Sequence, residues 1–93
     1  MSEGYRFLTD PGHGWLEVTV AELMRLQILG KISAYSYLSD DGKRAFLEED
    51  CDAPVFIEAK KAAGEEITGF DEQHTNGDCI VRSMRSYPFV QSE

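Results

Sequence analysis

Three clusters of turn-forming residues divide this sequence into segments that suit only short strands and helices. Residues 10–14 read Asp-Pro-Gly-His-Gly, residues 41–42 read Asp-Gly, and residues 76–77 read Asn-Gly. Proline fixes φ, and Gly, Asn and Asp tolerate positive φ, so these residues favour reversals of the chain. The two-residue signals predict tight hairpins with type I′ turns.

Apolar and aromatic segments flank these turns and suggest the strands. Strands are expected at residues 5–9, 15–18, 32–39, 44–48, 67–75 and 79–86. A helix is expected at residues 20–28, begun by a capping box of Thr19 and Glu22 and ended by Gly30. A second helix is expected after a cap at Asp50 or Asp52, with Pro54 in its first turn, an apolar stripe that includes Ala63, and Gly64 at its end.

These elements predict one α+β domain, with an antiparallel sheet built from hairpins and the approximate order ββαββαββ. The two-residue turns also predict pairings, namely Leu38 with Ala45, Tyr37 with Phe46, Ser36 with Leu47, Tyr35 with Glu48, Asp40 with Lys43, Asp71 with Arg82 and His74 with Cys79.

The chain of 93 residues has room for one hydrophobic core, so residues 1–93 are expected to form a single domain. Residues 5–87 are expected to be the ordered core, and residues 88–93 a frayed tail. The sequence shows neither a secretory signal nor a membrane-length apolar run, which predicts a cytoplasmic location and no membrane partner. Cys51 and Cys79 are then expected to be free, buried thiols, and the alternative is one disulfide between them.

The charge of the chain is acidic and uneven. The formal net charge is −8, and residues 40–52 and 58–78 each contribute −4 of it. Negative charge of this kind opposes direct nucleic-acid binding and favours a partner with a basic surface.

The candidate chemical groups do not form a known site. His13, Cys51, His74 and Cys79 are zinc-ligand types, but their spacing fits no zinc motif. The acids Glu48, Glu49, Asp50 and Asp52 lack the spacing of a calcium loop. We therefore predict no metal, no cofactor and no catalytic residues, and hence a protein that is not an enzyme.

The hairpin around Asp41-Gly42 is the best candidate for a binding surface. Alternation along its strands places Tyr35, Tyr37 and Phe46 on one face, with acids beside them. Aromatic side chains are common anchors at protein interfaces, whereas the alternative is that a helix covers this face. The predicted partner-binding residues are Tyr35, Tyr37, Asp41, Phe46, Glu48 and Glu49.

Two motifs carry a resemblance, Gly-His-Gly-Trp-Leu-Glu-Val at residues 12–18 and Leu-Glu-Glu-Asp-Cys-Asp-Ala at residues 47–53. The chain resembles a family of small uncharacterised proteins carried by bacteriophages, plasmids and their hosts. The resemblance implies a counter-defence role of the anti-CRISPR type, in which an acidic protein mimics nucleic acid.

The leading hypothesis is a small binding protein that inhibits a host protein or ribonucleoprotein complex by docking on its basic nucleic-acid-binding site. One alternative is a non-inhibitory adaptor or structural homodimer that buries the same aromatic face. The other is a small metal- or thiol-dependent enzyme that uses His13, Cys51, His74 and Cys79.

Overall fold

The computed structural model describes residues 5–67 and 69–89 of the chain. Short strands alternate with short helices. Their bounds are β1 (Tyr5–Thr9), β2 (Gly14–Thr19), α1 (Val20–Arg25), the 3₁₀ helix η1 (Leu29–Lys31), β3 (Tyr37–Leu38), β4 (Arg44–Glu48), α2 (Ala53–Ala62), β5 (Phe70–His74), the 3₁₀ helix η2 (Ile80–Ser83) and β6 (Arg85–Ser86). The α+β class and the predicted order ββαββαββ are confirmed.

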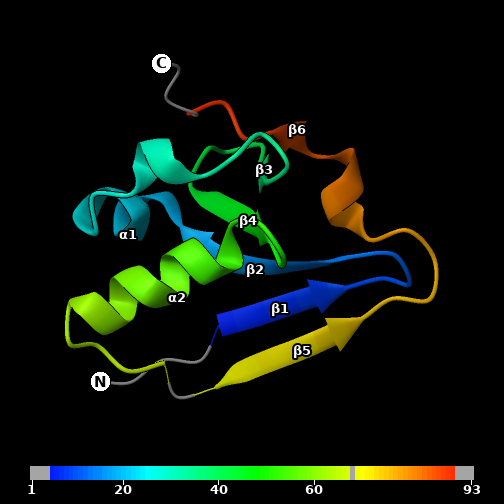
Figure 1. Cartoon of the computed structure of the whole chain (residues 1–93). Helices are drawn as coiled ribbons and strands as arrows, with labels where there is room; N and C mark the ends of the chain where they lie inside the picture. Colours follow the sequence, from blue (N-terminus) through cyan, green and yellow to red (C-terminus); the bar gives the residue numbers. More distant parts are fainter. Residues whose placement is uncertain (1–4, 68, 90–93) are drawn as a thin grey trace.

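All six strands lie in one sheet, in the spatial order β5-β1-β2-β4-β3-β6 (Figure 1). β5 runs parallel to β1, and the other neighbouring pairs are antiparallel. The prediction of a wholly antiparallel sheet is therefore wrong at this edge. α2 carries the chain over the sheet from β4 to β5, and such a crossover delivers a strand in the parallel direction.

The turn between β1 and β2 is held by a single buried carboxylate. Asp10 Oδ1 accepts hydrogen bonds from the amides of Gly12 and His13 at 2.9 and 3.0 Å. The Asp10 amide donates to the His13 carbonyl at 2.9 Å, which closes the loop. The predicted turn at residues 10–14 is confirmed.

Helix α1 begins as predicted and ends early. The Thr19 hydroxyl accepts a hydrogen bond from the Glu22 amide at 3.2 Å, as expected of an N-cap. The helix ends at Arg25 because Gln27 adopts a left-handed conformation with φ of 62°. Gly30, the predicted end of this helix, lies in η1 instead.

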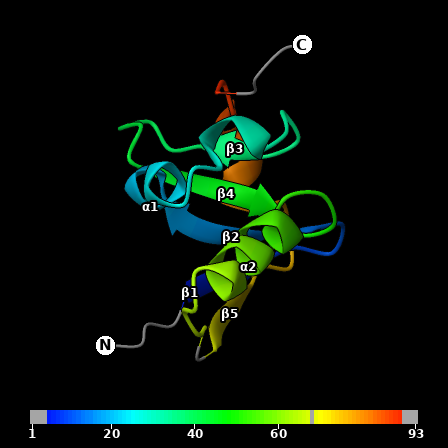
Figure 2. The same ribbon diagram turned by 60° about the vertical axis from the view of Figure 1, so that its left-hand side comes forward.

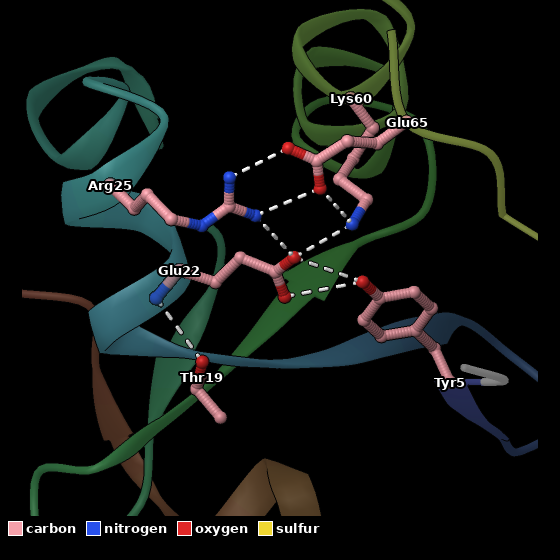
Figure 3. Close-up of polar contacts among 6 residues, drawn as sticks. All are labelled: Tyr5, Thr19, Glu22, Arg25, Lys60 and Glu65. Atoms are coloured by element: carbon pink, nitrogen blue, oxygen red, sulfur yellow. Dashed lines mark hydrogen bonds and ion pairs between the residues drawn. The ribbon is translucent and has the colours of Figure 1, made fainter. Parts of the chain in front are cut away.

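The Glu22 carboxylate does not complete the capping box, because it lies in a charged cluster that joins β1, α1 and α2 (Figure 3). Glu22 Oε2 lies 2.8 Å from Lys60 Nζ and 3.1 Å from Arg25 Nη2, and the Tyr5 hydroxyl donates to it at 3.0 Å. Glu65 pairs with Arg25 at 2.6 Å and with Lys60 at 2.9 Å. Burial would lower the pKa of Lys60, but hydrogen bonds to Glu22 and Glu65 outweigh it and raise that pKa. Two acids and two bases thus neutralise one another.

We expect Glu65→Gln to destabilise the protein at neutral pH and to have a much smaller effect at about pH 2. Arg25 and then Lys60 lower the pKa of Glu65 from 4.5 to about 2. The stabilisation is therefore present above pH 4.5, declines below it and is lost as the pH falls through about 2. Urea unfolding of the wild-type protein and of Glu65→Gln between about pH 2 and pH 7 tests this prediction. A difference in unfolding free energy that does not change with pH would contradict it.

The hairpin of β3 and β4 keeps the predicted register but not the predicted length. Tyr37 pairs with Phe46 and Leu38 with Ala45, and β4 spans the predicted residues 44–48. The expected strand at residues 32–39 is wrong apart from β3, because residues 33–36 form a turn. The pairings expected for Ser36 and Tyr35 are therefore absent from the register of the described strands.

The turn of this hairpin is not of type I′, since Gly42 has positive φ and Asp41 does not. The Asp41 carboxylate accepts hydrogen bonds from the Ser39 hydroxyl at 2.6 Å and from the Lys43 amide at 2.9 Å. The Ser39 bond first, and then the Lys43 bond, lowers the pKa of Asp41. The predicted pair of Asp40 with Lys43 is not among the ion pairs of residues 5–67 and 69–89.

Helix α2 starts and stops where the sequence predicts. Asp52 occupies the N-cap position, Pro54 lies in the first turn, and Gly64 follows the helix with φ of 75°. Phe56 is fully buried, whereas Ala63, expected on the same apolar stripe, is exposed. The Asp52 side chain does not cap the helix, because it binds the segment before β3.

The predicted hairpin at Asn76-Gly77 is wrong. β5 pairs with β1, and residues 79–86 form η2 and β6 instead of a return strand. His74 Nδ1 therefore lies 2.8 Å from Thr9 Oγ1 and does not face Cys79. Asp71 is in register with Arg6, and not with Arg82.

Hydrophobic side chains fill both faces of the sheet. One core lies beneath the helices and contains Leu16, Val18, Leu23, Ile28, Ile32, Ala45, Leu47, Ala53, Phe56 and Tyr87. On the opposite face, the segment around η2 covers a smaller core of Leu8, Trp15, Phe46, Cys79 and Val81 (Figures 1 and 2). A hairpin at residues 67–86 would leave Cys79 and Val81 at a sheet edge, so burial of these two side chains favours the observed path.

The end of the described chain is anchored by Tyr87. Its ring is buried, and its hydroxyl donates to the Leu29 carbonyl at 2.5 Å. Burial raises the pKa of Tyr87 to about 12. Of the predicted tail, Pro88 and Phe89 are exposed, and residues 90–93 lie outside the described residues. The helices of the described residues are all too short or too polar to cross a membrane.

Candidate protein-binding site

A pocket of about 290 Å³ opens beside the ends of β2 and β4, and it gathers aromatic and charged side chains from distant parts of the chain. We call it the tyrosine pocket. Its lining residues are His13, Trp15, Tyr35, Tyr37, Glu48, Asp50, Cys51 and Arg82.

The aromatic side chains of the tyrosine pocket differ in exposure, from the buried Trp15 to the exposed Tyr35. Trp15 is buried, and its ring meets that of Tyr37 edge-to-face at 6.1 Å between centroids. Tyr37 is half-buried, and Tyr35 is 72% exposed. A buried aromatic side chain with an exposed aromatic ring near it, as Trp15 and Tyr35 are here, is an arrangement typical of interface anchors.

Glu48 supplies a carboxylate oxygen to the tyrosine pocket. Its Oε1 accepts hydrogen bonds from the amides of Asp50 and Cys51, both at 2.9 Å. Its Oε2 lies 3.6 Å from His13 Nδ1, which is longer than a hydrogen bond. The side chain is only 10% exposed, so its charge is held in a fixed position and keeps lone pairs for a ligand.

Arg82 also lines the tyrosine pocket, but its charge is neutralised. Its Nε and Nη2 donate to the two oxygens of Asp10 at 2.6 and 3.0 Å, and the guanidinium lies 5.3 Å from the centroid of the Trp15 ring. The Arg82 bonds, followed by the Cys79 amide, hold the pKa of Asp10 well below its usual range. The net charge of the remaining groups in the pocket is therefore negative.

The segment that carries Tyr35 is fixed by Asp52 at the start of α2. The Asp52 carboxylate accepts from the Ser33 amide at 3.0 Å, from the Ser33 hydroxyl at 2.7 Å and from the Ser36 hydroxyl. Ser36 Oγ accepts in turn from the Glu48 amide at 2.9 Å. These bonds tie the Tyr35 segment to the end of β4.

The structure brings only part of the predicted surface together. Tyr35, Tyr37 and Glu48 share the pocket. The expectation that Phe46 is an exposed anchor is wrong, because Phe46 is 3% exposed and packs under η2. Asp41 is exposed at the hairpin turn and does not line the pocket, and Glu49 lines a different groove.

Five residues of the pocket were not in the predicted surface, namely His13, Trp15, Asp50, Cys51 and Arg82. The two motifs at residues 12–18 and 47–53 contain four of them and lie side by side, since Trp15 pairs with Glu48 across β2 and β4. No local pattern in the sequence indicated that Arg82 lines this pocket, because its position depends on the path of η2.

The candidate metal and thiol groups are dispersed. His13 and Cys51 line the tyrosine pocket, whereas Cys79 is buried beneath η2 and His74 lies on β5. No three potential ligands among His, Cys, Asp and Glu are grouped for a metal within the described ranges. Both cysteines are free, but Cys51 is exposed, so the expectation that it is buried is wrong. Desolvation and the Glu48 carboxylate raise the pKa of Cys51, which disfavours a reactive thiolate.

No family model, curated protein or solved structure matches this chain. The resemblance to phage- and plasmid-borne proteins therefore stays a prediction. The geometry and charge of the tyrosine pocket are the basis for inferring a function.

Proposed function

We propose that this protein is a small inhibitor of the anti-CRISPR type, which docks the tyrosine pocket on a basic nucleic-acid-binding surface of a host complex. One observation carries the proposal: an exposed and a half-buried tyrosine stand beside a carboxylate that is held in a fixed position. The protein would act in the bacterial cytoplasm, without binding nucleic acid itself.

The chemistry of the pocket suits an arginine or lysine side chain of the partner. A guanidinium group stacks on an aromatic face and pairs with a carboxylate, as it pairs with phosphate in nucleic-acid binding. Tyr35 and Tyr37 offer the faces, and Glu48 and Asp50 offer the carboxylates. The net charge of −8 would steer the protein toward a basic surface.

Replacement of Tyr35 by Ala is expected to weaken binding by about tenfold or more, because exposed aromatic anchors dominate interface energies. The Tm should not change, since Tyr35 is 72% exposed. The measurement is the affinity for purified CRISPR effector complexes, with and without target DNA as a competitor. Met24→Ala is the matched control, because Met24 is an exposed apolar side chain on α1, outside the pocket.

Charge reversal separates the pocket from general electrostatics. Asp50→Lys should weaken binding much more than Glu58→Lys, although both exposed acids change the net charge equally. Affinity should also fall as salt is raised. Equal losses in the two variants, or affinity that does not depend on salt, would contradict docking through the pocket.

A further inference from the structure

The β5 edge of the sheet is an open strand beside an apolar groove. All five residues of β5 are exposed, and β1 is its only strand partner within the described residues. Natural edge strands are commonly protected by lysine, proline or a bulge. The β5 sequence Phe-Asp-Glu-Gln-His contains no lysine and no proline, but two adjacent acids.

A groove of about 330 Å³ lies between α2 and the strands β1 and β5. Its lining residues are Phe7, Leu16, Glu49, Ala53, Pro54, Ile57, Phe70 and Glu72. Phe70 is 50% exposed, and its ring lies 6.3 Å from that of Phe7. The groove shares no lining residue with the tyrosine pocket.

The register of β5 combines the groove and the edge into one surface. Phe70 and Glu72 are in register with Tyr5 and Phe7, so they point to the helix side of the sheet. Asp71 points to the opposite side. In a strand added to β5, every second side chain would therefore lie over the groove and the Glu72 carboxylate. The side chains in between would lie on the other face of the sheet, near Asp71.

We propose that β5 binds an extended, basic protein segment as an added strand, with one apolar side chain in the groove and lysine or arginine at nearby positions. Backbone hydrogen bonds to the strand edge would supply affinity, and the groove and carboxylates would supply specificity. Glu49 and Glu72 border the groove, and Asp71 lies on the other face, so a basic segment complements both sides.

Charge also argues against a second copy of this chain as the occupant. Pairing β5 with itself would bring Asp71 and Glu72 of two molecules together, and each molecule carries a net charge of −8. Like charges on adjacent strands are destabilising. The groove and the edge therefore favour a basic segment over self-association.

Titration with short peptides, followed by amide chemical shifts, tests this proposal. The probe is an acetylated, amidated octapeptide of alternating valine and lysine. We expect saturable shifts at Phe7 and residues 70–74. Binding should be at least about tenfold weaker in the Asp71→Lys variant, because the peptide lysines lie on the side of Asp71 when its valines cover the groove. Asp50→Lys and Tyr35→Ala should leave this binding unchanged, because both residues belong to the tyrosine pocket.

Two control peptides make the result decisive. A serine–lysine octapeptide of equal charge should bind at least tenfold more weakly, and N-methylation of the edge-facing amides should abolish binding. Equal binding of these controls, shifts confined to the tyrosine pocket, or no binding at millimolar peptide would overturn the proposal. A dimer in sedimentation that is broken by Glu72→Lys would identify a second copy as the occupant and would also overturn it.

Discussion

Replacement of Asp10 by Asn should lower the Tm by on the order of 10 °C and release the segment around η2 from the sheet. The Asp10 side chain is buried and accepts five hydrogen bonds, from the amides of Gly12, His13 and Cys79 and from two nitrogens of Arg82. Asparagine removes the negative charge and leaves the Arg82 guanidinium without its partner beside the buried Trp15.

Thermal unfolding and hydrogen exchange together test this prediction. The Cys79 amide should lose protection in Asp10→Asn, whereas Asp78→Asn, a change at an exposed acid nearby, should leave both measurements unaltered. The pKa of Asp10 is lowered in the folded protein, so its stabilisation is present above the ordinary value of 3.8 and decreases on acidification. A normal Tm with intact protection at Cys79 would contradict the role assigned to Asp10.

Replacement of Asp52 by Ala should cost about 3 kcal/mol of unfolding free energy. Asp52 and Ser36 are both buried, and the carboxylate is the acceptor for the Ser33 amide and hydroxyl and for the Ser36 hydroxyl. Its loss leaves these donors without a partner and removes the link between α2 and the segment that carries Tyr35. Partner binding should therefore weaken as well, although Asp52 does not line the tyrosine pocket.

Urea unfolding of Asp52→Ala, Ser36→Ala and the double variant measures this coupling. The double variant should be less destabilised than the sum of the single variants, because both changes disrupt one network. Asp50→Ala is the control, since Asp50 is exposed and its side chain makes no hydrogen bond within the described ranges. Additive losses would show that Asp52 and Ser36 act independently.

Local signals in the sequence predicted the parts of the fold that are held by nearby residues. The turn at Pro11-Gly12, the cap at Thr19, the Leu38–Ala45 register and the end of α2 at Gly64 depend on short-range geometry, and the structure confirms them. The partners of β5 and β6 were not predictable in this way. Asn76-Gly77 is a strong hairpin signal, but burial of Cys79 and Val81 against the sheet takes precedence.

The candidate site was predictable only where it lies on the sheet. Alternation along β3 and β4 brought Tyr37 and Glu48 to one face, and Tyr35 lies beside them although its own segment is a turn. The same alternation selected Phe46, which is buried because η2 covers that face. The position of η2 depends on the pair of Asp10 with Arg82, which are far apart in the sequence.

The structure also divides the acidic residues by their roles. Asp10 and Asp52 hold distant segments in place, and Glu22 and Glu65 neutralise the buried Lys60 and the exposed Arg25. These residues contribute to the net charge but are already engaged within the protein. The two proposed surfaces use other acids, namely Glu48 and Asp50 at the tyrosine pocket and Glu49, Asp71 and Glu72 at the groove and along β5. Asp41, Glu58 and Asp78 are exposed elsewhere.

Photo-crosslinking at position 35 tests the central claim, that the tyrosine pocket docks on a basic nucleic-acid-binding surface. Tyr35 would be replaced by p-benzoylphenylalanine, with Met24 replaced in the same way as a control, and crosslinking would be carried out with purified CRISPR effector complexes. We expect crosslinks from position 35, but not from position 24, to an arginine- or lysine-rich segment, and their loss in the presence of excess target nucleic acid. Crosslinks that persist under saturating nucleic acid, or that join two copies of this chain, would contradict it.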